Sequence, residues 1–209
     1  GQNTYMGDFS RVDKRVKKLP EFFRQPVSQP QTHQEGKNWA APLSQPLVSR
    51  DLVLVGRTFG QNTAHPLLEP GKESHRTRAN GMGFTPYGTL YGGLLLRPGI
   101  DGRLYCLHPE GGAVLWSVQL GERLFGCPVV IAEDVFLTGE RTLYQVDLAS
   151  GSVLKEAALS GPVRGSLASD GKHLLFLSED GYLQCWDAAE LREVWKLPVG
   201  KYTDSTPAV

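Results

Sequence analysis

The chain is a succession of short apolar runs separated by turn residues. Between residues 128 and 159 the sequence contains the runs PVVIA, DVFLTG, TLYQVD and SVLKEAAL, with turn residues such as Ala-Ser-Gly between them. Apolar and polar positions alternate within the runs, which is typical of half-buried strands, and no segment carries the longer period of an amphipathic helix. This part of the sequence therefore predicts four strands.

The strand pattern recurs along the chain. The segment DGRLYCLHPEGGAVLWSVQLG (101–121) aligns with ERTLYQVDLASGSVLKEAALS (140–160) and with DGYLQCWDAAELREVWKLPVG (180–200), at a spacing of 39 to 40 residues. A repeat of roughly 40 to 45 residues that contains four strands is typical of one blade of a β-propeller.

The three units resemble the PQQ-like, or quinoprotein-type, β-propeller repeat, whose consensus is close to DGxLYALDxxTGxxLWxxxLG. Residues 101–121 match it closely, residues 180–200 match it well, and residues 140–160 have Lys155 in place of the Trp. The resemblance extends over 85–209 and, more weakly, over 44–84. It implies an all-β fold, a β-propeller with about four recognisable four-stranded blades that form part of a larger seven- or eight-bladed ring.

The repeat predicts the domain boundaries. We expect an extended arm over residues 1–43 and propeller blades over 44–209, where 206–209 begin a further blade of a longer protein. The regular blades are predicted at residues 85–126, 127–165 and 166–205. The first unit, 44–84, is degenerate, because residues 59–84 are polar and lack the strand–turn–strand pattern. Long loops in compact domains are often functional, so we expect a partner-facing insertion at 59–84.

The resemblance also implies which residues join neighbouring blades. In the family the Trp packs flat between two blades, and the following Gly lets the chain turn into the next blade. Here these roles fall to Trp116 with Gly121 and to Trp195 with Gly200. A large aromatic ring suits this position because it covers much of the surface between two sheets. The predicted core is Leu104, Tyr105, Trp116, Val129, Val130, Phe136, Leu143, Val146, Phe176, Leu183, Trp186 and Trp195.

Composition excludes several classes of protein. The 209 residues are 40% hydrophobic and contain 22 Lys and Arg against 22 Asp and Glu, so no net field favours a nucleic-acid partner. No apolar run approaches the roughly 20 residues of a membrane-spanning helix, and we expect no membrane-spanning segment in this chain. The Cys and His residues lack metal-binding spacings, so we predict no metal ligands.

No pattern in the sequence predicts catalysis. Turn chemistry accounts for Asp101, Asp180 and Asp187, and no nucleophile elbow is present. We therefore predict no catalytic residues, no cofactor-binding residues and no cofactor. Within its family the chain resembles BamB-like envelope scaffold proteins. The resemblance implies a non-catalytic scaffold or adaptor that binds other envelope proteins, in the periplasm or at the outer membrane of a bacterium.

The candidate partner-binding residues lie outside the regular blades. They are Phe22 and Phe23 on the arm and His65, Leu67, Arg76 and Arg78 in the insertion.

Two other functions stay open at the level of the sequence. A fragment of a PQQ-dependent dehydrogenase would hold its quinone and calcium ion in blades that these residues do not include. A ligand-sensing propeller would be attached to a signalling segment. Only the first alternative requires PQQ and calcium.

Overall fold

The computed structural model describes residues 46–57, 61–69, 71–78, 84–85, 87–200 and 206–207. The predicted arm, with Phe22 and Phe23, lies outside the described residues. The described part of the chain is all-β, and none of it forms a helix that is long and apolar enough to cross a membrane.

In the described part of the chain, sixteen strands form four antiparallel sheets, which we call blades 1 to 4. Blade 1 contains β1 (Leu47–Ser49), β2 (Leu52–Arg57), β3 (Gln61–Pro66) and β4 (His75–Arg78). Blade 2 contains β5 (Thr89–Tyr91), β6 (Leu94–Pro98), β7 (Arg103–Leu107) and β8 (Val114–Gln119). Blade 3 contains β9 (Leu124–Ile131), β10 (Asp134–Gly139), β11 (Thr142–Asp147) and β12 (Val153–Ala158). Blade 4 contains β13 (Ala168–Ser169), β14 (His173–Ser178), β15 (Tyr182–Asp187) and β16 (Arg192–Pro198).

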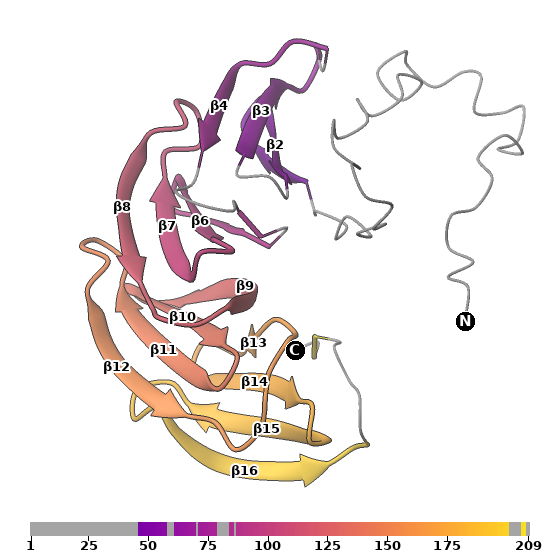
Figure 1. Cartoon of the computed structure of the whole chain (residues 1–209), viewed down its shortest axis with the longest axis vertical. Helices are drawn as coiled ribbons and strands as arrows, with labels where there is room; N and C mark the ends of the chain where they lie inside the picture. Colours follow the sequence, from indigo (N-terminus) through magenta and orange to yellow (C-terminus); the bar gives the residue numbers. More distant parts are fainter. Residues whose placement is uncertain are drawn as a thin grey trace, which may run out of the picture. The chain divides into compact units, whose positions relative to one another are not determined.

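Each blade is a simple meander. Its four strands pair in the order in which they follow along the chain. Figure 1 shows the blades one after another along an arc, with β8, β12 and β16 on its outer side. The sequence-based prediction of an all-β propeller with four-stranded blades is therefore confirmed.

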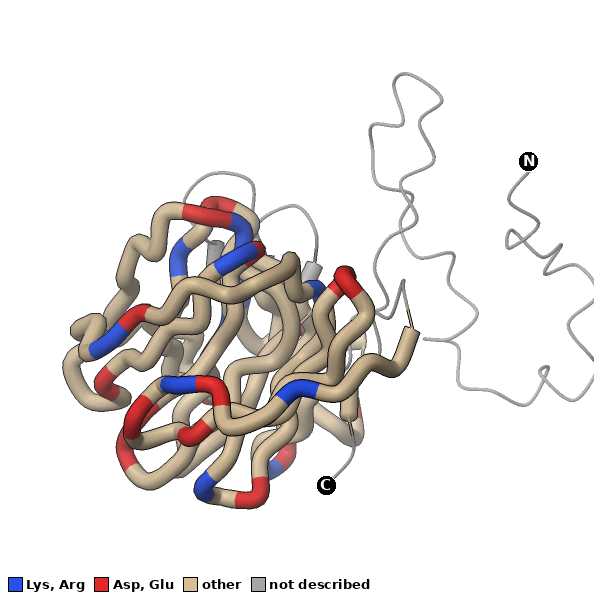
Figure 2. Tube along the Cα trace, turned by 90° about the horizontal axis from the view of Figure 1, so that it is seen from below, with Lys and Arg blue, Asp and Glu red and all other residues tan. Residues whose placement is uncertain are grey.

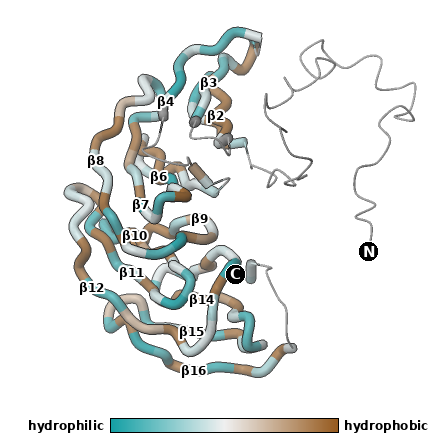
Figure 3. Tube along the Cα trace, in the orientation of Figure 1, coloured by the Kyte–Doolittle hydropathy of each residue, from teal (hydrophilic) through white to brown (hydrophobic). Residues whose placement is uncertain are grey.

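Hydrophobic side chains fill the spaces between neighbouring blades. One cluster joins blades 1 and 2 through Leu54, Phe84 and Leu95, and equivalent clusters join blades 2 and 3 and blades 3 and 4. Burial of apolar surface is the main stabilising contribution here. Figure 3 shows hydrophobic residues distributed along the strands of blades 2 to 4, whereas β4 is mostly hydrophilic.

Short turns end the strands where the sequence predicts them. The Asp147 carboxylate accepts a hydrogen bond from the Ser150 backbone N–H at 2.7 Å, and Asp187 accepts one from Glu190 at 2.8 Å. Asp101 accepts a hydrogen bond from the Arg103 backbone N–H at 3.1 Å. These three carboxylates therefore hold turns, as Asp residues commonly do.

Blade 1 corrects one prediction. Residues 59–84 were expected to form a polar loop, but they contain β3 and β4. The side chains of β3 alternate between the two sides of the sheet. Buried Ala64 faces blade 2, and Thr63 and His65 lie on the opposite side. The strands were missed because that opposite side is polar and because β4 carries no Trp.

The predicted core needs a second correction. Trp195 is 42% exposed, because no described residue covers its side of β16. Leu183, Trp116, Val129 and Val130 are only partly buried. The other predicted core residues are buried: Leu104, Tyr105, Phe136, Leu143, Val146, Phe176 and Trp186.

Candidate functional site

One position of the outer strand makes contact with the following blade. The strand register places His75, Trp116, Lys155 and Trp195 at this position in β4, β8, β12 and β16. The Trp116 indole N–H donates to the Leu148 carbonyl at 2.9 Å. The Lys155 ammonium donates to the Ala189 carbonyl at 2.6 Å. Both acceptors belong to the turn between the third and fourth strands of the next blade.

Glycine in the receiving turn makes room for the side chain from the preceding blade. A Cβ atom added to Gly151 would lie 2.6 Å from the Trp116 ring, and one added to Gly112 would lie 2.4 Å from the His75 ring. Both glycines have positive φ, at 74° and 68°. His75 therefore occupies the position of the docking Trp in blade 1. The sequence analysis did not identify it, although it lies one repeat length before Trp116.

The last outer strand leaves its apolar side chains exposed. Trp195, Leu197 and Val199 are exposed by 42%, 53% and 47%, and we call these three residues the β16 stripe. Gly200 follows the stripe with φ 117°, as Gly121 follows β8 with φ 85°. These left-handed conformations favour glycine, which is the backbone role that the family resemblance implies for both residues.

The opposite end of the arc presents a second surface. On the side of blade 1 that faces away from blade 2 lie Val53, Val55, Thr63, His65, Leu67 and Arg76, which we call the blade 1 face. Three of the predicted partner-binding residues, His65, Leu67 and Arg76, are thus brought to one surface. Phe22 and Phe23 lie outside the described residues, as does the side chain of Arg78.

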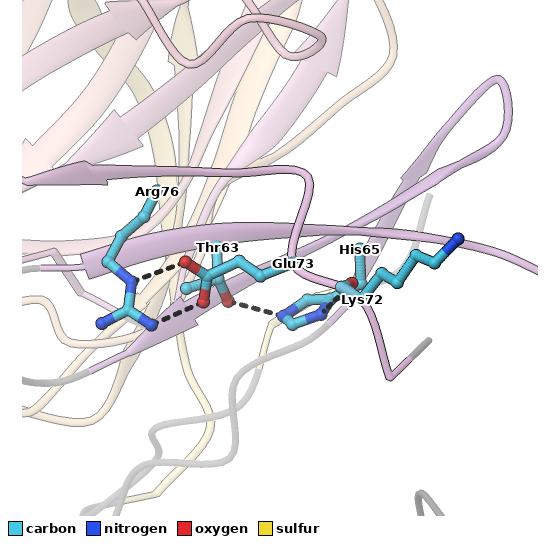
Figure 4. Close-up of polar contacts among 5 residues, drawn as sticks. All are labelled: Thr63, His65, Lys72, Glu73 and Arg76. Carbon is cyan, nitrogen blue, oxygen red and sulfur yellow. Dashed lines mark hydrogen bonds and ion pairs between the residues drawn. The ribbon is translucent and has the colours of Figure 1, made fainter. Parts of the chain in front are cut away.

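Hydrogen bonds fix the polar part of the blade 1 face (Figure 4). The His65 Nδ1 atom donates to the Lys72 carbonyl at 3.0 Å, because a carbonyl can only accept. In the neutral ring, Nε2 then accepts from the Thr63 hydroxyl at 3.2 Å. Arg76 donates from Nε and Nη2 to the two Glu73 carboxylate oxygens, at 2.9 and 2.6 Å. This bidentate hydrogen bonding raises the pKa of Arg76 and fixes the plane of its guanidinium.

Two apolar side chains are exposed on the same blade. Leu67 is 47% exposed and Leu68 is 91% exposed at the start of the turn after β3. Large exposed Leu side chains on a blade that also carries a fixed ion pair are suited to contact with another protein surface. The charges on the rest of the molecule do not indicate a positively or negatively charged partner, because Figure 2 shows Lys and Arg interspersed with Asp and Glu.

A buried cation between blades 1 and 2 was not predicted from the sequence. Arg97 in β6 is fully buried, and its Nη1 atom lies 3.5 and 3.4 Å from the carbonyls of Thr85 and Tyr87. Its Nε and Nη2 atoms have no hydrogen-bond partner. Burial lowers the pKa of Arg97 to about 10, so the side chain is still charged at neutral pH. The equivalent residues of blades 3 and 4 are Leu137 and Phe176.

Among the described residues, no group of three or more His, Cys, Asp or Glu side chains is arranged to hold a metal ion. The geometry that is present supports contacts between surfaces. At each of the three described interfaces a backbone carbonyl accepts a hydrogen bond from an outer-strand side chain of the preceding blade: Gly112 from Thr77, Leu148 from Trp116 and Ala189 from Lys155. Glycine makes room for that side chain at the first two interfaces.

Four-stranded blades that dock through their outer strands define the chain as a β-propeller protein. The described chain carries this arrangement through all three of its blade–blade interfaces. It belongs to the family described as outer membrane protein assembly factor BamB, whose model matches residues 37–154 and 100–209. The predicted PQQ-like, BamB-type repeat is therefore confirmed. No curated protein matched the chain.

Solved structures share the fold. The crystal structure of BamB from Moraxella catarrhalis has a TM-score of 0.62 and 21% sequence identity, over 75% of this chain and 48% of that one. The computationally designed Ika4 protein has a TM-score of 0.62 and 14% identity, over 72% of this chain and 94% of that one. The designed Ika8 protein has a TM-score of 0.63 and 16% identity, over 75% and 49%. The chain thus spans about half the length of BamB and Ika8.

Proposed function

We propose that the protein is a non-catalytic propeller scaffold that binds other proteins in a bacterial cell envelope, in the periplasm or at the outer membrane. It acts without a quinone or a calcium ion and does not bind nucleic acid. Membership of the BamB family supports the location, because the family description is that of an outer membrane assembly factor.

The observation that carries the proposal is the composition of the blade 1 face. Exposed Leu67 and Leu68 follow β3 on the same antiparallel sheet that carries the Arg76–Glu73 ion pair. Binding surfaces commonly combine an apolar centre with a polar rim, and Arg is enriched at their strongest contacts. A pre-formed ion pair also lowers the entropy lost when a partner docks.

In-cell photo-crosslinking tests the proposal. A photoreactive amino acid is placed at Arg76 in the full-length protein in its own source, and a matched control is placed at Glu156. Both positions are exposed and occupy the same place in β4 and β12. We expect the protein in the envelope fraction and an adduct with a second envelope protein from position 76, but none from position 156.

Two outcomes would contradict the proposal. One is a protein recovered only in the cytoplasmic fraction. The other is equal crosslinking from positions 76 and 156, which would mean that the blade 1 face has no preference for a partner. A mass increment for bound quinone and calcium in native mass spectrometry would replace the scaffold with a dehydrogenase.

A further inference from the structure

The interface between blades 1 and 2 contains polar atoms that lack partners. In the described part of the chain, six buried side-chain atoms have no hydrogen-bond partner. Five of them belong to residues of this interface: Asn62 Oδ1, His75 Nδ1 and Nε2, and Arg97 Nε and Nη2. The sixth, Gln145 Oε1, lies in blade 3. Buried polar atoms without partners cost free energy, so they weaken this interface relative to the other two.

Among these residues, His75 is the one that changes charge near neutral pH. It occupies in β4 the position that Trp116 and Lys155 occupy in β8 and β12. Trp116 and Lys155 each donate a hydrogen bond to a turn of the next blade. The His75 ring packs against the corresponding turn at Gly112, but neither of its nitrogen atoms has a partner there. The hydrogen bond that joins β4 to this turn comes from the Thr77 hydroxyl instead.

The surroundings of the His75 ring favour its neutral form. A second histidine, His108, belongs to the turn that receives the ring, so protonation would bring two imidazolium groups together. The other charged residues on the elements that pack against the ring form two ion pairs, Arg50–Glu110 at 2.7 Å and Glu73–Arg76 at 2.6 Å (Figure 4). Burial is the main cause that lowers the pKa of His75, while Glu73 raises it and His108 lowers it.

We propose that protonation of His75 releases the outer strand of blade 1 from blade 2, so that this interface is closed at neutral pH and opens in acid. The neutral ring leaves one donor and one acceptor without partners, whereas the imidazolium leaves two donors and a buried positive charge. Movement of β4 away from Gly112 lets water bind both N–H groups. This inference goes beyond the proposed function and does not depend on it.

The sign of the pH dependence follows from proton linkage. A histidine whose pKa in the closed form lies below its ordinary value of 6.5 binds a proton more readily once the interface opens. The closed form is therefore fully favoured above pH 6.5, and this advantage is lost as the pH falls toward the pKa of the closed form. Between pH 7.5 and pH 5 the ratio of open to closed molecules should rise, by at most about 30-fold.

Backbone hydrogen exchange, followed by mass spectrometry on the full-length protein, measures this opening. Rates at pH 7.5 and pH 5 are divided by the intrinsic exchange rates, because amide exchange itself depends on pH. We expect the protection of β4 and of residues 108–112 to fall several-fold at pH 5, while β11 and β12 keep their protection. Protection of β4 that is the same at both pH values would overturn the proposal.

Two variants separate His75 from the other titrating groups. His75→Phe keeps a ring against Gly112 but cannot be protonated, so the protection of β4 should no longer depend on pH. His173→Phe is the matched control, because His173 lies in β14 and its Nδ1 atom bonds to Asp170 at 2.9 Å. It should keep the pH dependence of the wild type in β4. A His75→Phe protein that also keeps this dependence would mean that another group causes the opening.

A titration of the wild type needs no folded variant. In NMR spectra of the protein with ¹³C-labelled histidine, the His75 ring should titrate below pH 6.5 and over the same range in which β4 loses protection. A ring that titrates at or above 6.5, or that titrates while β4 stays protected, would overturn the proposal. Crosslinking from position 76 at neutral pH, where the interface is closed, tests the proposed function separately.

Discussion

At the scale of single residues, Arg97 is the least expected feature of the molecule. It places a charge where the equivalent residues Leu137 and Phe176 pack as hydrophobic core. Two of its nitrogen atoms lack partners, and a buried charge without an acidic partner is costly. Gly56 is part of this arrangement, because a Cβ atom there would lie 2.1 Å from the Arg97 Nη1 atom.

We therefore expect Arg97→Leu to raise the free energy of unfolding, by about 1 to 3 kcal/mol. Gly56→Ala should destabilise the wild type and cost much less in the Arg97→Leu background, because the contact with Nη1 is then absent. Chemical denaturation of the four combinations measures this coupling. The control Arg123→Leu changes an exposed residue and should have little effect. Additive effects of the two substitutions would contradict the predicted contact.

At the scale of elements, the turn carboxylates make stability depend on pH. Hydrogen bonds from the Ser150 side chain and backbone lower the pKa of Asp147, and the Glu190 backbone N–H lowers the pKa of Asp187. A carboxyl whose folded pKa lies below its unfolded value stabilises the fold at pH values above the unfolded pKa. This contribution is lost as pH falls from about 3.8 through the folded pKa.

We expect Asp147→Asn to be less stable than the wild type at pH 6, and the difference to shrink as pH falls below 3.8. Asn keeps the shape of the side chain, so the comparison isolates the charge. Thermal midpoints measured between pH 6 and pH 2.5 provide the test. Glu133→Gln changes an exposed carboxyl and serves as the control. A difference that is constant over this range would exclude the charge as its cause.

The outer strands give a second prediction at this scale. Trp116 packs against Gly151 and bonds to Leu148, so Trp116→Ala should cost about 3 kcal/mol. Trp195→Ala in the monomer should cost less than about 1 kcal/mol, because its side chain is already exposed. Urea denaturation at low protein concentration compares the two. Equal losses would mean that Trp195 is covered within the monomer.

The sequence predicted the strands of the blades better than it predicted which side chains their neighbours cover. Alternating runs and the repeat predicted four-stranded blades, and in the structure Trp116 packs into the cluster between blades 2 and 3. The same repeat could not reveal that Trp195 is exposed, because exposure depends on which blade follows. His75 and the polar strand β3 were missed because the search relied on a Trp and on apolar side chains. Arg97 was missed because a single charge in an apolar strand resembles any surface residue.

At the scale of the whole molecule, the arc is a one-dimensional array of blades. Among the described residues, blades 2 and 3 each pack against two neighbouring blades, whereas blades 1 and 4 each pack against one. In such arrays stability is the sum of each unit and its interfaces, so units with one interface open first.

Native-state hydrogen exchange of the 209-residue chain should therefore depend on position along the arc. We expect the amides of β15 and β2 to exchange faster than those of β7 and β11, because opening blade 1 or blade 4 breaks a single described interface. Uniform exchange along the chain would contradict this prediction, because it would mean that the blades unfold as one unit.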